Sequence, residues 1–213
     1  MDDARLYVPA ANALDLDGAR RLVDQVAVAQ LVTVASDGSP DVTFLPVIWR
    51  ESTLVGHLAL ANRHHRRIID GSVALAVVTG PDAYVSPSAY PSKAEHGKVV
   101  PTWNYSVVQI RGVVRVIRDV EWLRTLVTEL TVCHEGRRDR PWAVSDAPAD
   151  FIDAQLRAII GVELTVTSVE AKAKLSQNRS DADRAGVRSD LQTRGDRAAA
   201  VAAAMTETEP EPT

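Results

Sequence analysis

Alternating apolar and polar positions predict an antiparallel sheet in the first half of the chain. The apolar, β-branched segment 29–35 is followed by the turn signal Asp-Gly-Ser-Pro at 37–40 and by a second apolar segment, 41–49. Strand, turn and strand in this order predict a β-hairpin. Further strands are expected over 53–61, 73–79, 102–117 and 162–169.

Helical spacing and capping residues predict the helices. Asn62 and Gly71 mark the expected start and stop of a short helix. Asp119 is expected to cap a helix whose apolar residues recur every three to four positions as far as Cys133. A second helix is predicted over 147–160 and ends at Gly161, and Ser180 is expected to cap a third that extends to about residue 193.

The order of these elements predicts the fold class. The expected order is hairpins, a short helix, strands, two helices, one strand and a terminal helix. This order lacks the regular alternation of strands and helices that a parallel α/β sheet requires. We therefore predict an α+β protein, an antiparallel β-barrel with additional C-terminal helices. Residues 1–194 are expected to form this domain, and residues 195–213 a disordered tail, rich first in Ala and then in Thr, Glu and Pro, with a short helix at most.

Composition narrows the function classes. The net charge of −4 argues against a surface built for non-specific binding of nucleic acid. There is no apolar run long enough to span a membrane, and the first residues are charged, so we expect a cytoplasmic protein. Cys133 is the single cysteine, which we interpret as a packed or inert thiol. The histidines lack ligand spacing, and no metal site is predicted.

Three polar or aromatic segments are candidates for ligand binding. Residues 101–105 (Pro-Thr-Trp-Asn-Tyr) offer an aromatic wall and edge hydrogen bonds for a flat ligand, or a core anchor for the strand. Residues 62–67 (Asn-Arg-His-His-Arg-Arg) place cations in the first turn of a predicted helix, as a phosphate seat or a solvated basic face. Residues 174–179 (Lys-Leu-Ser-Gln-Asn-Arg) form a polar connector. Paired catalytic groups are not evident, so binding is indicated more clearly than catalysis.

Six motifs in register carry a family resemblance over roughly residues 5–191. They are LYVP at 6–9, GHLALAN at 56–62, AYVSPSAYPSK at 83–93, VPTWNY at 100–105, PW at 141–142 and KLSQNR at 174–179. Through these six motifs the chain resembles the PaiB family of FMN-binding negative transcriptional regulators. The resemblance implies the split-barrel flavin fold of pyridoxamine phosphate oxidases, in which two subunits pair and FMN lies in the groove between them.

The resemblance also implies which residues bind FMN. Those expected to line the flavin are Thr43, Leu45, Pro46, His57, Leu60, Ala61 and Asn62. Arg66 and Arg67 would face the phosphate. Trp103, Asn104 and Tyr105 would contact FMN across the dimer, and Ser176, Gln177 and Asn178 would close the polar side.

Three functions remain open at this point. The first is a flavin-binding regulator that represses transcription directly or through a partner, although no helix-turn-helix motif is recognised. The second is a flavin-dependent oxidoreductase acting on a small molecule. The third is a binding protein for another ligand, because Leu60 stands where the family usually shows an Arg and Ala89 where it shows an aromatic residue.

Overall fold

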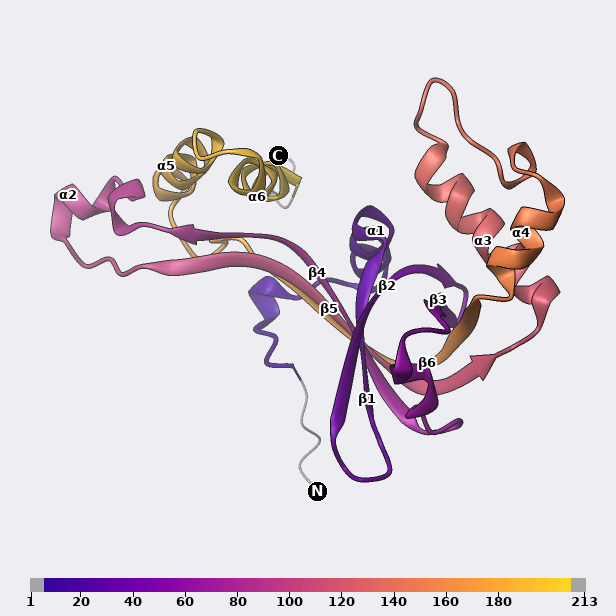
Figure 1. The fold of residues 1–213 in the computed structure, drawn as a ribbon. Helices are drawn as coiled ribbons and strands as arrows, with labels where there is room; N and C mark the ends of the chain where they lie inside the picture. The colour runs from indigo at the N-terminus through magenta and orange to yellow at the C-terminus, as the bar shows by residue number, and fades with distance from the viewer. Residues whose placement is uncertain (1–5, 208–213) are drawn as a thin grey trace. The chain divides into compact units, whose positions relative to one another are not determined.

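The computed structural model describes residues 6–207, which divide into two compact units. Residues 20–78 and 109–169 form the first, here called the barrel unit. The remaining described residues, 6–19, 79–108 and 170–207, form the second, here called the helical unit. Three strands and the first α-helix run from one unit into the other along the chain, and Figure 1 labels the α-helices and strands.

Six antiparallel strands build the sheet. They are β1 (Val28–Val34), β2 (Pro40–Arg50), β3 (Thr53–Ala59), β4 (Val73–Val85), β5 (Thr102–Ile117) and β6 (Ile159–Lys174). Their order is β1-β2-β3-β6-β5-β4, and the order closes because β1 also pairs with β4, with Val32 opposite Leu75. The predicted antiparallel barrel fold is thus confirmed.

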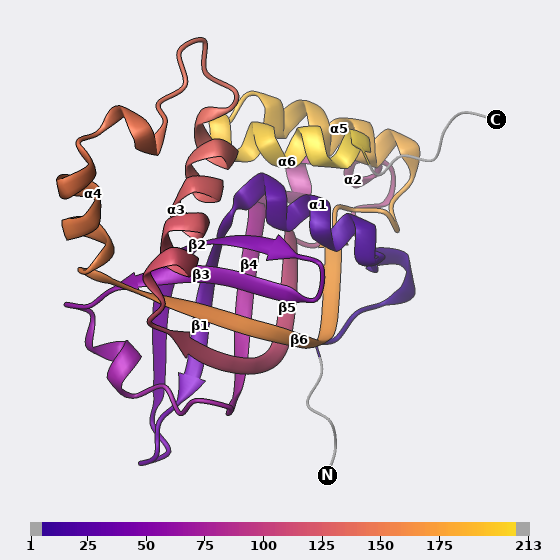
Figure 2. The ribbon, with the colours of Figure 1, turned by 90° about the vertical axis from the view of Figure 1, so that its right-hand side faces the viewer.

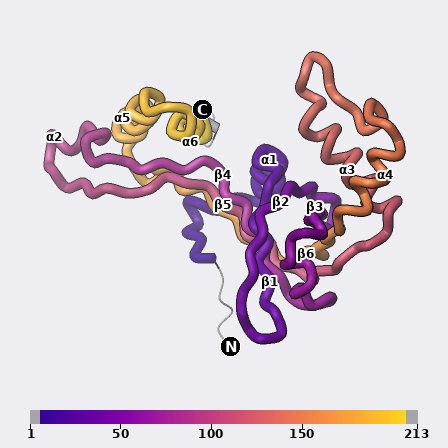
Figure 3. The backbone as a smooth tube through the Cα atoms, in the orientation of Figure 1, coloured from indigo at the N-terminus to yellow at the C-terminus, as the bar shows by residue number. Residues whose placement is uncertain are grey.

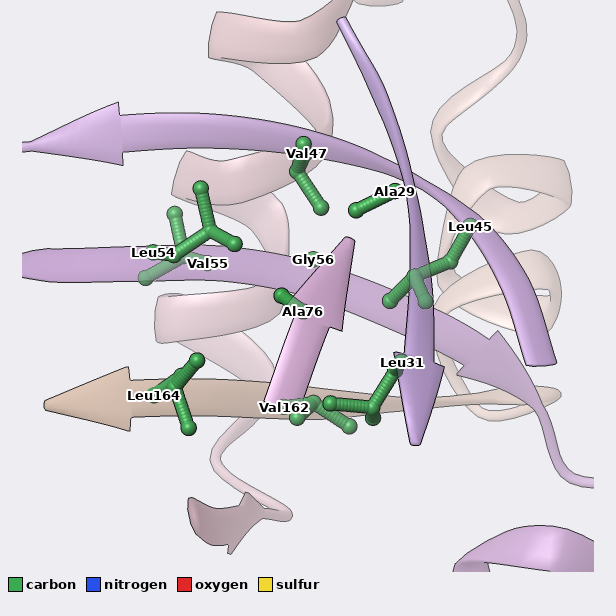
Figure 4. Close-up of a pocket in the computed structure, with 10 residues that line it drawn as sticks. All are labelled: Ala29, Leu31, Leu45, Val47, Leu54, Val55, Gly56, Ala76, Val162 and Leu164. Atoms are coloured by element: carbon green, nitrogen blue, oxygen red, sulfur yellow. The ribbon is translucent and has the colours of Figure 1, made fainter. Parts of the chain in front are cut away.

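The interior of the barrel is a packed core. Side chains from β1, β2, β3, β4 and β6 surround a cavity of only about 10 Å³, and Figure 4 shows that the ten residues lining it are all apolar. A cavity of this size holds one water at most, and its apolar lining keeps it dry. A flavin therefore cannot lie inside the barrel.

One helix covers the outer face of β2 and β3 in the barrel unit. This helix, α3 (Val120–Glu135), begins where Asp119 accepts a hydrogen bond of 2.7 Å from the backbone N–H of Trp122, as the sequence predicted. Figure 2 shows α3 lying over β2 and β3. Leu126 and Leu130 of α3 pack on Val55 of β3. The short helix α4 (Ala149–Leu156) packs on α3 through Ile152 and Leu156.

The helical unit is built on the outer ends of β4, β5 and β6. Residues 79–108 run out along β4, turn through a 3-10 helix, η3 (Pro87–Ala89), and α2 (Ser92–His96), and return along β5, as the tube in Figure 3 shows. Helices α5 (Asp181–Gln192) and α6 (Asp196–Glu207) pack together over an apolar cluster that includes Val85, Leu175 and Val187. The N-terminal segment adds a 3-10 helix, η1 (Ala10–Asn12), and the first residues of α1 (Leu16–Val26).

Several predicted boundaries differ from the structure. Residues 62–71 form only η2, a 3-10 helix over Arg63–Arg66, followed by a turn at Gly71 with φ of 81°. Strand β4 continues to Val85, where a turn was predicted from residue 80. Gly161 does not end a helix but lies inside β6, where it pairs with His57 of β3. A Cβ at this position would stand 2.3 Å from the Trp122 ring, so glycine is needed for this close approach.

The C-terminal segment and Cys133 also depart from prediction. Residues 196–207, expected to belong to a disordered tail, form α6, in which Ala198, Val201, Ala202 and Met205 are buried. The remainder of the predicted tail, 208–213, lies outside the described residues. Cys133, interpreted as a packed or inert thiol, is exposed and therefore not packed. No helix within residues 6–207 is long and apolar enough to cross a membrane.

Candidate functional site

The turn after β3 is fixed to the barrel by His64. Its imidazole Nε2 lies 2.8 Å from the hydroxyl of Thr33 on β1, and its Nδ1 lies 2.7 Å from the hydroxyl of Thr43 on β2. Asn62 caps η2, because its side-chain oxygen accepts from the N–H of His64 at 3.0 Å. The Asn62 amide also donates to the Thr43 hydroxyl at 3.1 Å. Two of the residues expected to line the flavin, Thr43 and Asn62, thus hold this turn in place.

The electrostatics of this cluster favour a neutral histidine. Burial lowers the pKa of His64, and this outweighs the opposing effect of the Asp41 carboxylate. With the pKa below its ordinary value of 6.5, the ring is uncharged near neutral pH. One hydroxyl therefore donates to the bare ring nitrogen and the other accepts from the ring N–H.

The two arginines expected to face the FMN phosphate lie in different environments. Arg67 is already paired: its Nε lies 2.7 Å from Asp41 Oδ2 and its terminal nitrogen 3.2 Å from Asp37 Oδ1. Arg66 is exposed and makes no ion pair with any residue of 6–207. Arg66 is therefore the cation available to a phosphate, whereas Arg67 stabilises the β1–β2 turn.

The remaining expected flavin contacts of the barrel unit point in several directions. Leu45 faces the barrel interior and is 3% exposed. Pro46 and His57 face outward and line a pocket beside α3. Leu60 is half-buried at the end of β3, and Ala61 is exposed. Because neighbouring strand residues point to opposite faces, these side chains do not converge on one surface.

In the helical unit, Asn104 and Ser176 bond to each other. The Asn104 amide nitrogen and oxygen each lie 3.1 Å from the Ser176 hydroxyl, and both side chains are buried. Ser176 has a φ of 66°, a conformation that costs a non-glycine residue energy, and the two hydrogen bonds offset part of that cost. The two segments singled out in the sequence, 101–105 and 174–179, therefore meet at this pair.

The neighbours of this pair differ in exposure. Trp103 is half-exposed and stands edge-on to Tyr84, with ring centroids 6.1 Å apart. Tyr105 lies under the ammonium of Lys172, 5.1 Å from the ring centroid. Gln177 bonds to the local backbone, accepting from Leu175 N at 2.7 Å, and Asn178 is exposed. Of the six residues of these segments expected to contact FMN, Trp103 and Asn178 are thus the exposed ones.

Sequence reasoning missed several side chains that the structure brings to these places. Thr33, Asp41 and Lys172 gave no local signal, because each acts on a partner far away in the sequence. Lys174 belonged to the predicted connector, but it lies at the end of β6 and donates to the Trp103 carbonyl at 2.9 Å. No group of three His, Cys, Asp or Glu side chains within residues 6–207 is arranged to hold a metal ion.

The residues present fit a flavin nucleotide in part. An unpaired cation, Arg66, suits a phosphate, and an accessible aromatic ring, Trp103, suits a planar ring system. Asn178 offers an accessible amide for hydrogen bonding. Arg66 belongs to the barrel unit, whereas Trp103 and Asn178 belong to the helical unit.

A sequence model of one protein family matches most of this chain. The family is described as "Putative FMN-binding domain", and the match covers residues 6–168. The chain belongs to this FMN-binding family. The predicted cofactor, FMN, is therefore confirmed at the level of the family.

Individual relatives agree with this assignment. The chain is 30% identical over 168 residues to the Bacillus subtilis protein "Protease synthase and sporulation protein PAI 2", an alignment that spans 76% of this chain and 77% of that protein. This confirms the predicted membership of the PaiB family.

Solved structures show the same fold at low identity. The FAD and heme binding protein from Mycobacterium smegmatis matches with a TM-score of 0.56 and 18% identity, over 82% of this chain and 79% of that one. The conserved hypothetical protein Rv2991 from Mycobacterium tuberculosis gives a TM-score of 0.60 and 12% identity, over 81% and 92%. The FMN-binding domain thus has the split-barrel fold predicted from the sequence.

Proposed function

We propose that this FMN-binding domain works as a homodimer and acts in the cytoplasm as a negative regulator of transcription. The observation that carries the proposal is the 30% identity to the Bacillus subtilis protein, whose name refers to protease synthesis and sporulation. Of the carboxylates described around η2, Asp37 and Asp41 are both engaged by Arg67. The residues of this region thus supply binding groups more clearly than an acid–base pair.

An uncovered apolar face on the barrel unit supports the homodimer. The outward positions of β1, β2 and β4 carry Val34, Val42, Phe44 and Val73, which are 51%, 60%, 72% and 70% exposed. The strand register places these positions on one face, since Gln30 lies opposite both Phe44 and Val77. Contiguous exposed apolar surface of this kind is typical of protein interfaces.

The homodimer is tested by placing a charge on this face. Phe44→Asp should convert a dimer into a monomer in light scattering coupled to size-exclusion chromatography, because the carboxylate would have to be desolvated in the interface. Phe151→Asp, the same change at a 54%-exposed residue on α4, is the matched control and should remain a dimer. A wild-type protein that is monomeric at micromolar concentration would refute this part of the proposal.

FMN binding is tested by the visible absorption spectrum and by titrating FMN into the apoprotein. We expect micromolar affinity, about −8 kcal/mol. Arg66→Ala should weaken binding at least about tenfold, because a charge-assisted contact to the phosphate is lost. Arg115→Ala removes an exposed arginine from β5 and should leave the affinity unchanged.

The regulatory role and the alternative, a flavin-dependent oxidoreductase, give different results with the FMN-loaded protein. A regulator that contacts DNA directly should retain a few specific fragments from sheared genomic DNA of its own source. An oxidoreductase should oxidise NADH or NADPH with multiple turnovers. Turnover together with no retained DNA would favour the oxidoreductase and count against the regulator.

A further inference from the structure

A pocket of about 300 Å³ lies between α3 and the outer face of β2 and β3, entirely within the barrel unit. Its floor is Pro46 and His57, and its walls come from the last turns of α3 and from Trp142 in the segment that follows. The residues of α3 that line it are Val127, Leu130, Thr131, His134 and Glu135. The volume lies at the lower end of the range typical of small-molecule sites.

His57 is one of the residues that line this pocket, and its ring carries an unsatisfied polar atom. Its ring Nδ1 is buried and has no hydrogen-bond partner among the described residues. Burial lowers the pKa of this histidine, so that the ring is neutral near pH 7. A neutral imidazole nitrogen can donate or accept one hydrogen bond, and leaving it without a partner in a buried place is unfavourable. A ligand with a polar edge would supply the missing partner.

Glu135 gives the pocket a fixed negative group. Its Oε2 accepts a hydrogen bond of 3.1 Å from the backbone N–H of Trp142, and its Oε1 lies 3.2 Å from Nε of Arg138. These contacts hold the carboxylate and the start of the Trp142 segment together. None of the eight lining residues is Lys or Arg, and Arg138, which lies outside the lining, is already paired with Glu135, so an anionic ligand would meet this carboxylate without an unpaired Lys or Arg in the pocket wall.

The other walls suit a flat ring. The indole of Trp142 is half-exposed, which leaves surface for stacking, and Val127, Leu130 and Pro46 are apolar. The hydroxyl of Thr131 donates to the Val127 carbonyl at 2.7 Å. This hydroxyl is therefore already engaged as a donor, and Thr131 offers the ligand its methyl group. Aromatic and apolar walls with a few polar groups are the usual composition of a site for a ring ligand.

We propose that this pocket binds a small, uncharged heteroaromatic molecule as a second ligand, separate from FMN. The ring would lie against Trp142, with one polar edge on His57 and an N–H donated to Glu135. FMN carries a phosphate that needs a cation, and the lining of this pocket provides neither Lys nor Arg. The proposal stands on the pocket alone and does not depend on the regulatory role.

The test is a titration of FMN-saturated protein with nicotinamide and with nicotinate, which share a ring and differ in charge. The readout is the NMR signal of the Trp142 indole N–H, assigned with a Trp142→Phe variant. Nicotinamide should shift this signal saturably with a dissociation constant in the millimolar range, as expected for a fragment-sized ligand. Nicotinate should bind at least about tenfold more weakly, because Glu135 repels its carboxylate.

Two variants and one matched control locate the effect. Thr131→Phe fills the pocket and should abolish the nicotinamide shift, whereas Thr125→Phe, the same change on the exposed side of α3, should retain it. Glu135→Gln should reduce the difference between the two probes to less than about threefold. If thermal melting shows that Thr131→Phe does not fold, the difference between the two probes in Glu135→Gln tests the proposal in its place.

Other results would overturn the proposal. These are the absence of a saturable shift with nicotinamide, equal binding of nicotinate, or a shift that survives in Thr131→Phe. Binding of nicotinamide only to FMN-free protein would also overturn it, because the pocket would then belong to the flavin. Failure of the wild type to bind FMN, with nicotinamide still bound, would refute the proposed cofactor binding and leave this second site standing.

Discussion

Removing the imidazole of His64 should destabilise the barrel unit by about 3 kcal/mol. The side chain is 5% exposed, and its two ring nitrogens bond to Thr33 and Thr43. In His64→Ala, two hydrogen bonds worth about 1 kcal/mol each are lost. The hydroxyl of Thr33, a residue that is 1% exposed, is left without this partner, and a cavity remains; together these add about 1 kcal/mol or more.

The assay is urea unfolding followed by circular dichroism, in a double-mutant cycle with Thr33→Val. Valine keeps the shape of threonine and removes the hydroxyl, so the cycle isolates the contact between the two side chains. We expect Thr33→Val to cost about 1 to 2 kcal/mol, and the double variant to cost clearly less than the sum of the two single changes. His134→Ala, an exposed histidine on α3, should stay within about 0.5 kcal/mol of the wild type.

The same residue should make stability depend on pH in a defined direction. Burial holds the pKa of His64 below 6.5, so the unfolded chain takes up a proton first as the pH falls. The stabilisation is complete above about pH 6.5 and is lost progressively below it, and His57 acts in the same direction. In His64→Ala the slope of stability against pH below 6.5 should be smaller. A cost below about 0.5 kcal/mol for His64→Ala, or an unchanged slope, would refute the reasoning.

Three further predictions concern packing and charge. Gly161→Ala should lower the free energy of unfolding, measured with urea, by about 1 to 3 kcal/mol, because its Cβ would stand 2.3 Å from the Trp122 ring. Gly71→Ala is the control that separates backbone strain from this clash, because φ is positive at Gly71 but nothing lies within 4 Å of its Cβ position. Deleting α6 should lower the melting temperature of the helical unit, since Val201 and Met205 are buried; no change would mean that the helix contributes little packing. Ser39→Ala should raise the pKa of Asp37 from about 2 towards 3.8 in a carboxyl NMR titration, more than Arg67→Ala does, because the hydrogen bond from the Ser39 hydroxyl is the largest cause of the low pKa, whereas the bond from the backbone N–H of residue 39 remains in the variant.

Local patterns predicted the elements whose stability is local. The alternation over 29–49 predicted the β1–β2 hairpin, which the structure confirms. The caps at Asp119 and Ser180 were also correct, since each side chain accepts from a backbone N–H three residues ahead. A cap or a two-residue period is encoded within a few positions, and no distant partner is needed to recognise it.

Predictions failed where a distant partner decides the conformation. Gly161 resembles a helix stop in the sequence, but in the structure it is a strand residue with the Trp122 ring directly above it. The basic run at 62–67 resembles the first turns of a longer helix, but His64 is drawn into hydrogen bonds with β1 and β2, and only η2 forms. The alanine-rich segment 196–207 lacks large apolar residues, but it packs as α6 because α5 and the ends of the strands provide the apolar surface.

For the candidate site, too, some features could be predicted from the sequence and others depend on distant partners. By itself the sequence predicted the antiparallel barrel, because strands and turns follow from local periods and turn residues, and its six motifs carried the resemblance that implies the family and the cofactor. Tertiary structure alone decided that Arg67 is engaged and Arg66 is available, that Asn104 and Ser176 satisfy each other, and that His57 faces a pocket beside α3. The physical reason is that burial, pairing and pKa depend on which atoms lie within a few ångströms, and strands far apart in sequence supply those atoms.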